Sequence, residues 1–244
     1  DGNDQLSGLG GVDVADGGKG NDTYKIQDIF DTVIAYADEG IDVLHAHVSF
    51  VLSAHVVNLR LTGSGDNAGS GNDLNNNVIG NKGANTLNGH NGNDHLAGRE
   101  GADILNGGAG NDRLFGNMDD DQISGGDNKD FLAGGDGNDT LNGDKGQDIL
   151  KGGKGVDELR GGAGDDILKG NAGADIFIFA IGDGADKLRD WTAEDTLRFE
   201  GLSADDLSIT QESSKTYIAY GDGDIVTLTN VEAADLTADV FEFV

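Results

Sequence analysis

The 244-residue sequence contains no cysteine, no proline and few aromatic residues, which make up 6% of the chain. Without cysteine the chain can form neither a disulfide scaffold nor a thiolate metal site. No run of eighteen apolar residues occurs, so no membrane-spanning helix is expected. Basic side chains are scarce, 16 against 45 acidic ones, which gives a formal net charge of −29. Because this charge is repelled by nucleic acid and by anionic lipid, we expect neither to be a partner.

Glycine, by contrast, is abundant, with 42 residues. Many glycines, few large apolar side chains and a strongly negative charge are together typical of a disordered chain, unless a periodic pattern or a counter-ion stabilises it. The N-terminus shows no basic segment followed by an apolar stretch, and Asp1 already lies inside the pattern described below. We therefore interpret the chain as part of a longer protein.

The pattern is a nine-residue repeat that runs through eleven copies from Gly80 to Phe177. Position one is glycine in every copy, and position four is glycine in nine copies, with Asp119 and Asn128 as the exceptions. After glycine, these two residue types tolerate a left-handed backbone best. Position eight is apolar throughout, from Leu87 to Phe177. Such regularity identifies a repeat architecture.

Position six carries the acidic residue of the repeat. It is Asn85 in the first copy and aspartate in the other ten, namely Asp94, Asp103, Asp112, Asp121, Asp130, Asp139, Asp148, Asp157, Asp166 and Asp175. A shorter block at the start of the chain has the same spacing, with Asp4, Asp13 and Asp22 nine residues apart.

The glycines predict a tight turn over the first six positions of each repeat and a very short strand over the last three. If each strand points one large apolar residue inward, two consecutive repeats close one turn of a flattened solenoid. The predicted fold class is therefore all-β, a parallel β-roll followed by a C-terminal β-rich capping segment. Such a thin leucine ladder cannot offset the backbone ordering entropy, which is about 1–2 kcal/mol per residue. The stacked aspartates would also repel one another.

A bound cation would resolve both problems. Aspartate and backbone carbonyl oxygens suit calcium, which accepts about six to eight oxygen ligands in a flexible geometry, better than they suit magnesium. Zinc and copper prefer imidazole or thiolate, and the repeat supplies neither. Because metal binding would then contribute directly to folding free energy, we predict several Ca²⁺ ions as cofactors.

Over Gly80–Asp175, and with fewer copies over Asp4–Lys25, the sequence resembles the RTX (repeats-in-toxin, hemolysin-type calcium-binding) repeats of bacterial type I secreted proteins. The resemblance implies that the position-six aspartates ligate calcium between turns two repeats apart. Asp94 would share an ion with Asp112, and so on along both edges of the roll. The expected metal ligands are the ten position-six aspartates together with Asp4, Asp13 and Asp22. Asn85 departs from the pattern, so the first site is expected to be weaker or empty.

We divide the chain into four segments: a short repeat block at 1–25, a bridging β segment without the nonapeptide at 26–79, the main β-roll at 80–179, and a capping and secretion-signal segment at 180–244. Strands are expected within the bridging segment at Val43–Leu52 and Val56–Leu61, where they would extend the solenoid with wider rungs.

The last segment differs in composition from the repeats. A buried strand is expected at Ile176–Phe179, and four further strands are expected at Asp195–Phe199, Leu207–Gln211, Thr216–Tyr220 and Asp224–Leu228. Gly221-Asp222-Gly223 would join the last two into a hairpin, and Ser203–Asp206 would cap a short helical turn. This order resembles the C-terminal region of type I secreted proteases, lipases and epimerases. The final residues Asp239–Val244 resemble the uncleaved export signals of that family, although a plain edge strand has the same pattern.

A search for catalytic motifs gives none. The sequence lacks the His-Glu-x-x-His and Gly-x-Ser-x-Gly patterns and a helix–loop–helix calcium loop. Carboxylate pairs such as Asp165-Asp166 are unremarkable among 45 acidic residues. His45 and His47 alternate on one predicted strand face, but no third ligand lies in register, so we interpret them as surface residues. We expect the chain itself not to be an enzyme.

Together these observations predict a secreted, extracellular bacterial module. It would fold on binding calcium outside the cell and support type I secretion, folding and stability of a larger exoprotein, with the secretion machinery contacting its C-terminus. Two alternatives stay open. The chain could be a calcium-stiffened adhesin or surface-layer segment that binds polysaccharide or a cell surface. It could also be the non-catalytic part of an exoenzyme whose active site lies upstream of Asp1.

Overall fold

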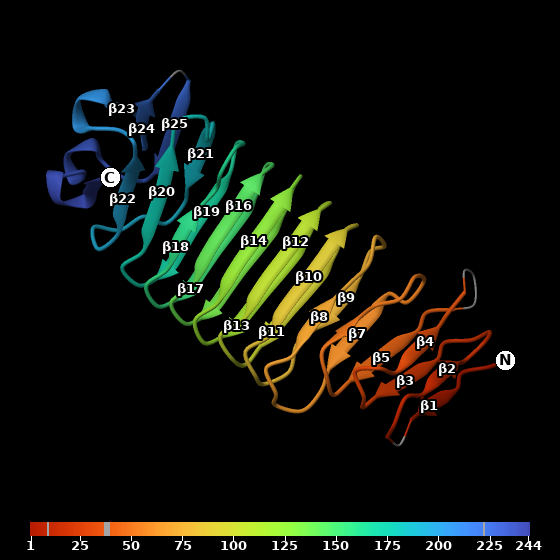
Figure 1. The fold of residues 1–244 in the computed structure, drawn as a ribbon. Helices are drawn as coiled ribbons and strands as arrows, with labels where there is room; N and C mark the ends of the chain where they lie inside the picture. Colours follow the sequence, from red (N-terminus) through yellow and green to blue (C-terminus); the bar gives the residue numbers. More distant parts are fainter. Residues whose placement is uncertain (9, 37–39, 222) are drawn as a thin grey trace.

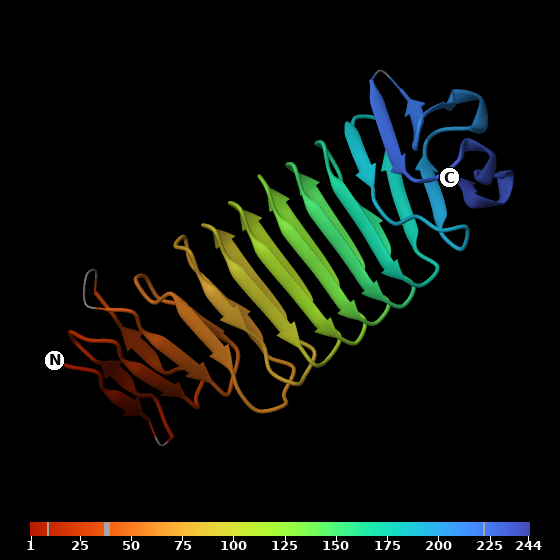
Figure 2. The same cartoon turned by 180° about the vertical axis from the view of Figure 1, so that it is seen from behind.

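The computed structural model describes residues 1–8, 10–36, 40–221 and 223–244. They form an elongated solenoid of short strands, with the two termini at opposite ends (Figures 1 and 2). Two faces oppose each other along its length, and from β1 to β22 the chain crosses to the opposite face after each strand. The predicted parallel β-roll is confirmed.

The first sheet contains fourteen strands. In spatial order they are β1 (Gln5–Ser7), β3 (Thr23–Ile26), β5 (Val43–Ala46), β7 (Asn58–Leu61), β9 (Asn77–Ile79), β11 (His95–Arg99), β13 (Arg113–Met118), β15 (Phe131–Asp136), β17 (Ile149–Lys154), β19 (Ile167–Ala172), β21 (Ala185–Leu188), β25 (Asp224–Thr229), β24 (Lys215–Tyr220) and β23 (Ser208–Glu212).

The opposite face contains a ten-stranded sheet and a separate pair. The ten strands are β26 (Phe241–Phe243), β22 (Thr196–Glu200), β20 (Ile176–Ala180), β18 (Glu158–Arg160), β16 (Thr140–Lys145), β14 (Gln122–Asp127), β12 (Ile104–Ala109), β10 (Thr86–Asn91), β8 (Ala68–Ser70) and β6 (Phe50–Val51). The pair is β2 (Val14–Asp16) with β4 (Thr32–Ile34). Three 3₁₀ turns, Ala204–Asp206, Ala233–Asp235 and Ala238–Val240, lie near the C-terminus.

Within the repeats, the parallel strands pair residues that are 18 positions apart. Leu87 pairs with Leu105 on one face, and Leu96 pairs with Leu114 on the other. Each turn of the solenoid therefore consists of two nonapeptides. The apolar residues at position eight, from Leu87 to Phe177, are all buried and form one continuous core between the two sheets.

The bridging segment extends the solenoid, but its turns are uneven rather than uniformly wide. Thr23 pairs with Val43, Val43 with Asn58, and Asn58 with Asn77, so successive steps are 20, 15 and 19 residues. The single strand expected at Val43–Leu52 is wrong, because the chain turns after Ala46 and crosses to the opposite face before β6. The strand expected at Val56–Leu61 corresponds to β7.

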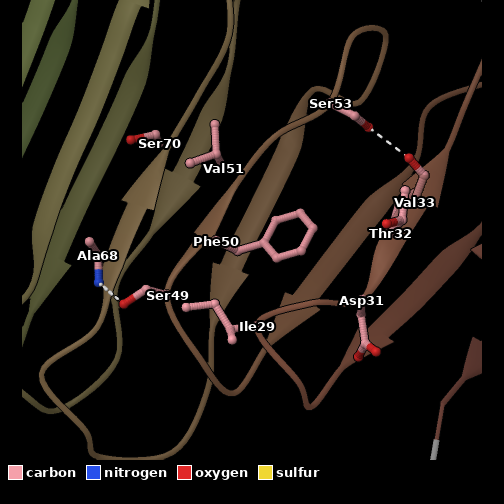
Figure 3. A pocket seen from close by; sticks show the side chains of 10 residues that line it. All are labelled: Ile29, Asp31, Thr32, Val33, Ser49, Phe50, Val51, Ser53, Ala68 and Ser70. Carbon is pink, nitrogen blue, oxygen red and sulfur yellow. Dashed lines mark hydrogen bonds between the residues drawn. The ribbon is translucent and has the colours of Figure 1, made fainter. Parts of the chain in front are cut away.

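One face of the roll is interrupted at this point. The strands β4 and β6 belong to different sheets, whereas β3, β5 and β7 on the other face are continuous. An open groove of about 400 Å³ separates β4 from β6, and the ring of Phe50 points into it (Figure 3). The Ser53 hydroxyl reaches across and donates a hydrogen bond to the Val33 carbonyl oxygen at 3.1 Å.

The C-terminal segment adds the antiparallel strands β23 and β24 to the edge of the first sheet. The expected strands and the short turn at Ala204–Asp206 are present, and the Ser203 hydroxyl donates to Asp206 at 2.7 Å. The middle of the expected hairpin turn, residue 222, lies outside the described residues. The strand β21 was not predicted from the sequence. No helix in the described part of the chain is both long and apolar enough to cross a membrane.

Candidate metal sites

The position-six aspartates form two rows, one along each edge of the roll. Asp94, Asp112, Asp130, Asp148 and Asp166 precede strands of the fourteen-stranded sheet and form the first carboxylate row. Asp103, Asp121, Asp139, Asp157 and Asp175 precede strands of the ten-stranded sheet and form the second carboxylate row. All ten residues are at most 2% exposed. The stacking comes directly from the 18-residue register, because each aspartate lies over the one a turn earlier.

Adjacent aspartates within a row are joined through the backbone. The amide of Asp94 donates to Oδ1 of Asp112 at 2.7 Å, and the amide of Asp112 donates to Oδ1 of Asp130 at the same distance. The second row repeats this bond, for example from Asp103 to Asp121 at 2.7 Å. The pairs expected from the two-repeat spacing are therefore brought together.

The other carboxylate oxygen has no partner. In nine of the ten residues, all but Asp175, the buried Oδ2 atom finds no hydrogen-bond donor among the described residues. Leaving a buried charged oxygen without a donor costs more than the roughly 1–3 kcal/mol lost at a neutral group. The glycine at position one leaves the space beside this oxygen open, since a Cβ on Gly98 would collide with Oδ2 of Asp103.

Burial raises the pKa values of these carboxyls. The pKa is about 8 for Asp121 and Asp130, and about 6 for Asp103 and Asp166, with neighbouring carboxylates adding to the effect. A carboxyl whose pKa is higher in the folded than in the unfolded state destabilises the fold increasingly as the pH rises above the unfolded value. Without cations, the roll thus gains stability as the pH falls through the range of the raised values. At neutral pH the burial of these carboxyls opposes folding, because each must either be buried as an anion or take up a proton.

These features fit calcium. The unpartnered oxygens are anionic, desolvated and regularly spaced, and a hard cation that takes oxygen ligands would satisfy them. Within the described residues, no three acidic or histidine side chains converge on one point. Each ion would therefore be held by aspartates of adjacent turns, such as Asp112 and Asp130, together with backbone carbonyl oxygens of the glycine turns.

The N-terminal block continues the same arrangement. The amide of Asp4 donates to Oδ1 of Asp22 at 2.8 Å, and Asp13 and Asp22 also have buried, unpartnered Oδ2 atoms. Asp4 is different, because its side chain is 52% exposed. It stands at the open end of its row.

The sequence analysis missed four aspartates that extend the rows. Asp31 and Asp42 accept the amides of Asp13 and Asp22 at 3.1 and 2.9 Å. Asp186 accepts the amide of Asp166 at 3.0 Å, and Asp195 accepts the amide of Asp175 at 2.9 Å. Asp31 follows Asp22 by nine residues, so spacing alone could have found it. The other three lie 20 residues from their partners, which breaks the nine-residue count.

The two nonapeptides before the main rows, which make up one turn of the solenoid, carry asparagine in place of aspartate. Position six is Asn76 in residues 71–79 and Asn85 in residues 80–88, and in these two copies position two is also asparagine. The Asn72 side-chain amide donates to the carbonyl oxygens of Ser53 and Val56 at 2.9 and 2.8 Å. The Asn81 amide likewise donates to carbonyl oxygens of the preceding turn, those of Thr62 and Gly65, at 3.2 and 3.0 Å.

The side-chain amides of Asn72 and Asn81 thus donate hydrogen bonds inside the turn. In the turns that carry aspartate, a cation is needed in the corresponding place. The Oδ1 atoms of Asn76 and Asn85 accept hydrogen bonds from the backbone amides of Asn72 and Asn81, both at 2.7 Å. Asparagine carries no charge that must be neutralised, so these turns are complete without metal. We call residues 71–88 the asparagine-bridged turn.

The repeat is also recognised by comparison with known proteins. The family model for the RTX calcium-binding nonapeptide repeat matches residues 1–24, 70–105, 97–132, 124–159 and 151–185, more than half of the chain. The chain belongs to this family of calcium-binding repeats, which occur in type I secreted, extracellular bacterial proteins. A search of curated proteins finds no match.

Several solved structures are similar. The extracellular lipase LipA from Serratia marcescens shares 20% identity with a TM-score of 0.43, over 85% of this chain and 45% of that chain. This chain thus spans less than half the length of the lipase. Two subunits of the mannuronan C5-epimerase from Azotobacter vinelandii also match. AlgE6R3 has 27% identity and a TM-score of 0.23, over 52% of this chain and 79% of that chain. AlgE6R2 has 30% identity and a TM-score of 0.24, over 53% and 91%.

Replacing Asp130, Asp139 and Asp148 together by alanine should lower the number of bound calcium ions, because each supplies an unpartnered oxygen to the rows. Residues 180–244 should keep most of their structure. The matched control replaces Asp127 and Asp136, whose carboxylates are 56% and 57% exposed and pair with lysines. Native mass spectrometry in calcium measures the ion count, and an unchanged count in the triple variant would contradict the ligand assignment.

Asn81→Ala should destabilise the calcium-loaded protein by about 1–3 kcal/mol, since the hydrogen bonds of the buried Asn81 side chain to the Thr62 and Gly65 carbonyl oxygens are lost. The number of bound calcium ions should stay the same. Thermal unfolding and ion counting on the same samples separate the two effects. Asn91→Ala, at an exposed position, serves as the control, and a lowered ion count in the Asn81 variant would show that this turn holds metal after all.

Proposed function

We propose that this chain is a calcium-dependent folding module of a larger exported protein. The observation that carries the proposal is the double row of buried carboxylates with unpartnered oxygens. With a net charge of −29 and no cation, these rows favour the unfolded chain. Extracellular calcium modules bind the ion with dissociation constants of about 10⁻⁴ to 10⁻³ M. Calcium bound in this range outside the cell would neutralise the rows and make folding favourable.

The same switch suits export. A chain that stays unfolded where calcium is scarce remains competent to pass through a type I exporter, and it would fold only on the outside. The C-terminal residues would make contact with the secretion machinery while unfolded. In the folded protein Phe241–Phe243 form the last strand of the ten-stranded sheet, where Glu242 pairs with Arg198 at 2.7 Å. Folding would thereby withdraw the signal and oppose backward movement.

Residues 180–244 would act as the cap of the roll. Phe199 contacts the rings of Phe179, Tyr220, Phe241 and Phe243, with centroids 5.2 to 6.3 Å apart. This aromatic cluster covers the last turn of the leucine core and gives the C-terminal end a stability that depends less on metal than the repeats do. Catalytic activity, if the full protein has one, we assign to residues outside this chain.

A second candidate function rests on the groove between β4 and β6. It combines an aromatic ring, Phe50, with the hydroxyl-bearing side chains Thr32, Ser49 and Ser70 (Figure 3). An aromatic face flanked by hydroxyl groups is a suitable surface for a sugar ring. On this reading the roll would be a stiff spacer that presents a polysaccharide-binding groove.

Adding calcium to the chelated protein should convert a largely disordered chain into the β-roll. Circular dichroism and thermal unfolding measured during the titration check this, and magnesium at equal concentration is the control, because it demands a stricter octahedral geometry. If chelation left both the β signal and the thermal midpoint unchanged, the folding-switch proposal would be wrong.

For the groove, Phe50→Ala should weaken retention on a polysaccharide by about tenfold, or 1.4 kcal/mol, through loss of the ring surface. Affinity electrophoresis through gels that contain dextran or polygalacturonate, with calcium present throughout, gives the comparison. Phe115→Ala, on the repeat surface, is the control. Equal mobility of the wild type with and without either polymer would exclude the second candidate.

A further inference from the structure

The first turn of the C-terminal segment is a degenerate repeat. Residues 181–189 keep glycine at positions two and four, aspartate at position six and leucine at position eight, but position one is Ile181. Gly182 and Gly184 both have φ of +97°, and Leu188 is buried and pairs with Leu168. The turn therefore stacks on the last nonapeptides as another rung, although two extra residues lengthen the step to 20.

Asp186 is the position-six residue of this rung and ends the first carboxylate row. Its Oδ1 accepts the amide of Asp166 at 3.0 Å, as in every earlier step. Its Oδ2 is buried and has no partner among the described residues, and the residue is 1% exposed. The row of unsatisfied oxygens thus continues beyond the nonapeptides into the C-terminal segment.

Asp195, at the end of the second row, provides a direct contrast. It is also buried, and its Oδ1 accepts the amide of Asp175 at 2.9 Å. Its Oδ2, however, accepts the amide of Thr192 at 2.7 Å. The second row is therefore closed by a backbone donor, whereas the first row ends on an oxygen that still needs a partner.

A second unpartnered group belongs to the hairpin that pairs with this rung through β25. The Tyr220 hydroxyl, on β24 of the terminal hairpin, has no hydrogen-bond partner among the described residues although Tyr220 is 1% exposed. Burial raises the pKa of this phenol, and the negative charges of Asp186 and Asp183 raise it further, so the hydroxyl stays neutral. A buried tyrosine hydroxyl normally finds a partner.

The hairpin is held against this turn by hydrogen bonds from backbone amides to an aspartate side chain. Asp224, which pairs with Tyr220 across the hairpin, accepts the amides of Gly182 and Gly184 at 2.9 and 3.0 Å. Asp183 accepts the amide of Ala180 at 2.7 Å. Both oxygens of Asp224 and Oδ2 of Asp183 are occupied by these donors. The two carboxylates add negative charge near the site, while Asp186 and Tyr220 supply the buried oxygens without a donor.

We propose that a further calcium ion is bound at this junction by the carboxylates of Asp166 and Asp186, with the neutral Tyr220 hydroxyl as an additional oxygen donor, directly or through one water molecule. The inference rests on the proposed calcium-dependent folding of the roll. The ion would join the terminal hairpin to the end of the first row, so that the C-terminal segment docks fully only when calcium is present.

The test compares Asp186→Asn with Asp195→Asn, a matched pair at the ends of the two rows. Native mass spectrometry, at the lowest calcium concentration that saturates the wild type, should show one ion fewer in Asp186→Asn and the wild-type count in Asp195→Asn. The wild-type ion count in Asp186→Asn would overturn the inference and indicate that a shared proton or a water molecule satisfies Asp186. A wild type that binds no calcium would instead refute the proposed function.

Tyr220→Phe keeps the ring and removes only the hydroxyl, so it tests the site even if the Asp186 variant does not fold. We expect the affinity of a single site to fall about tenfold, as for loss of a supporting metal contact. Terbium luminescence, excited through the aromatic side chains, should fall for that site, while the circular dichroism spectrum in saturating calcium stays the same. Unchanged calcium affinity and terbium luminescence would remove Tyr220 from the site.

Discussion

The stability of this roll depends on how one buried carboxylate per repeat is satisfied. One oxygen of each aspartate accepts the backbone amide of the turn before it, and this bond sets the vertical spacing of the solenoid. The second oxygen is left without a donor inside a nearly dry interior. Two other features of the repeat accommodate that oxygen. The glycine at position one leaves room for it, and the apolar residue at position eight packs in the core and excludes water there.

The asparagine-bridged turn shows that the same backbone can close without a cation. An amide NH₂ provides two donors, and Asn72 and Asn81 each direct theirs at carbonyl oxygens of the turn below. The chain thus joins two kinds of turn, one satisfied internally and one completed by metal. The 15- and 19-residue steps of the bridging segment lead up to the asparagine-bridged turn. The 20-residue step joins Asp22 to Asp42 and still belongs to a carboxylate row.

Much of this organisation could be predicted from the sequence because the repeat makes each residue's environment nearly identical. Nine-residue spacing was sufficient to predict the turn, the buried leucine, the 18-residue stacking and the position-six rows. It could not predict Asp42, Asp186 or Asp195, since a two-residue insertion shifts the count while the strand pairing absorbs it. The crossing after Ala46 was also missed, because residues 43–52 contain no glycine, asparagine or aspartate that would signal a change of face. The bridging role of Asn81 depends on a side-chain direction that residue type alone does not fix.

The 18-residue register also governs how such a roll can change its length. From β1 to β22, odd-numbered and even-numbered strands lie on opposite faces. Removing one nonapeptide would therefore move every downstream strand of the roll to the other face and every downstream aspartate to the other row. Removing two would shorten the solenoid by one turn and leave all later side chains in equivalent places. The fold therefore tolerates the duplication or loss of repeats only in pairs. The two rows end differently, at Asp186 and at Asp195, so each row of aspartates must keep its own face of the roll.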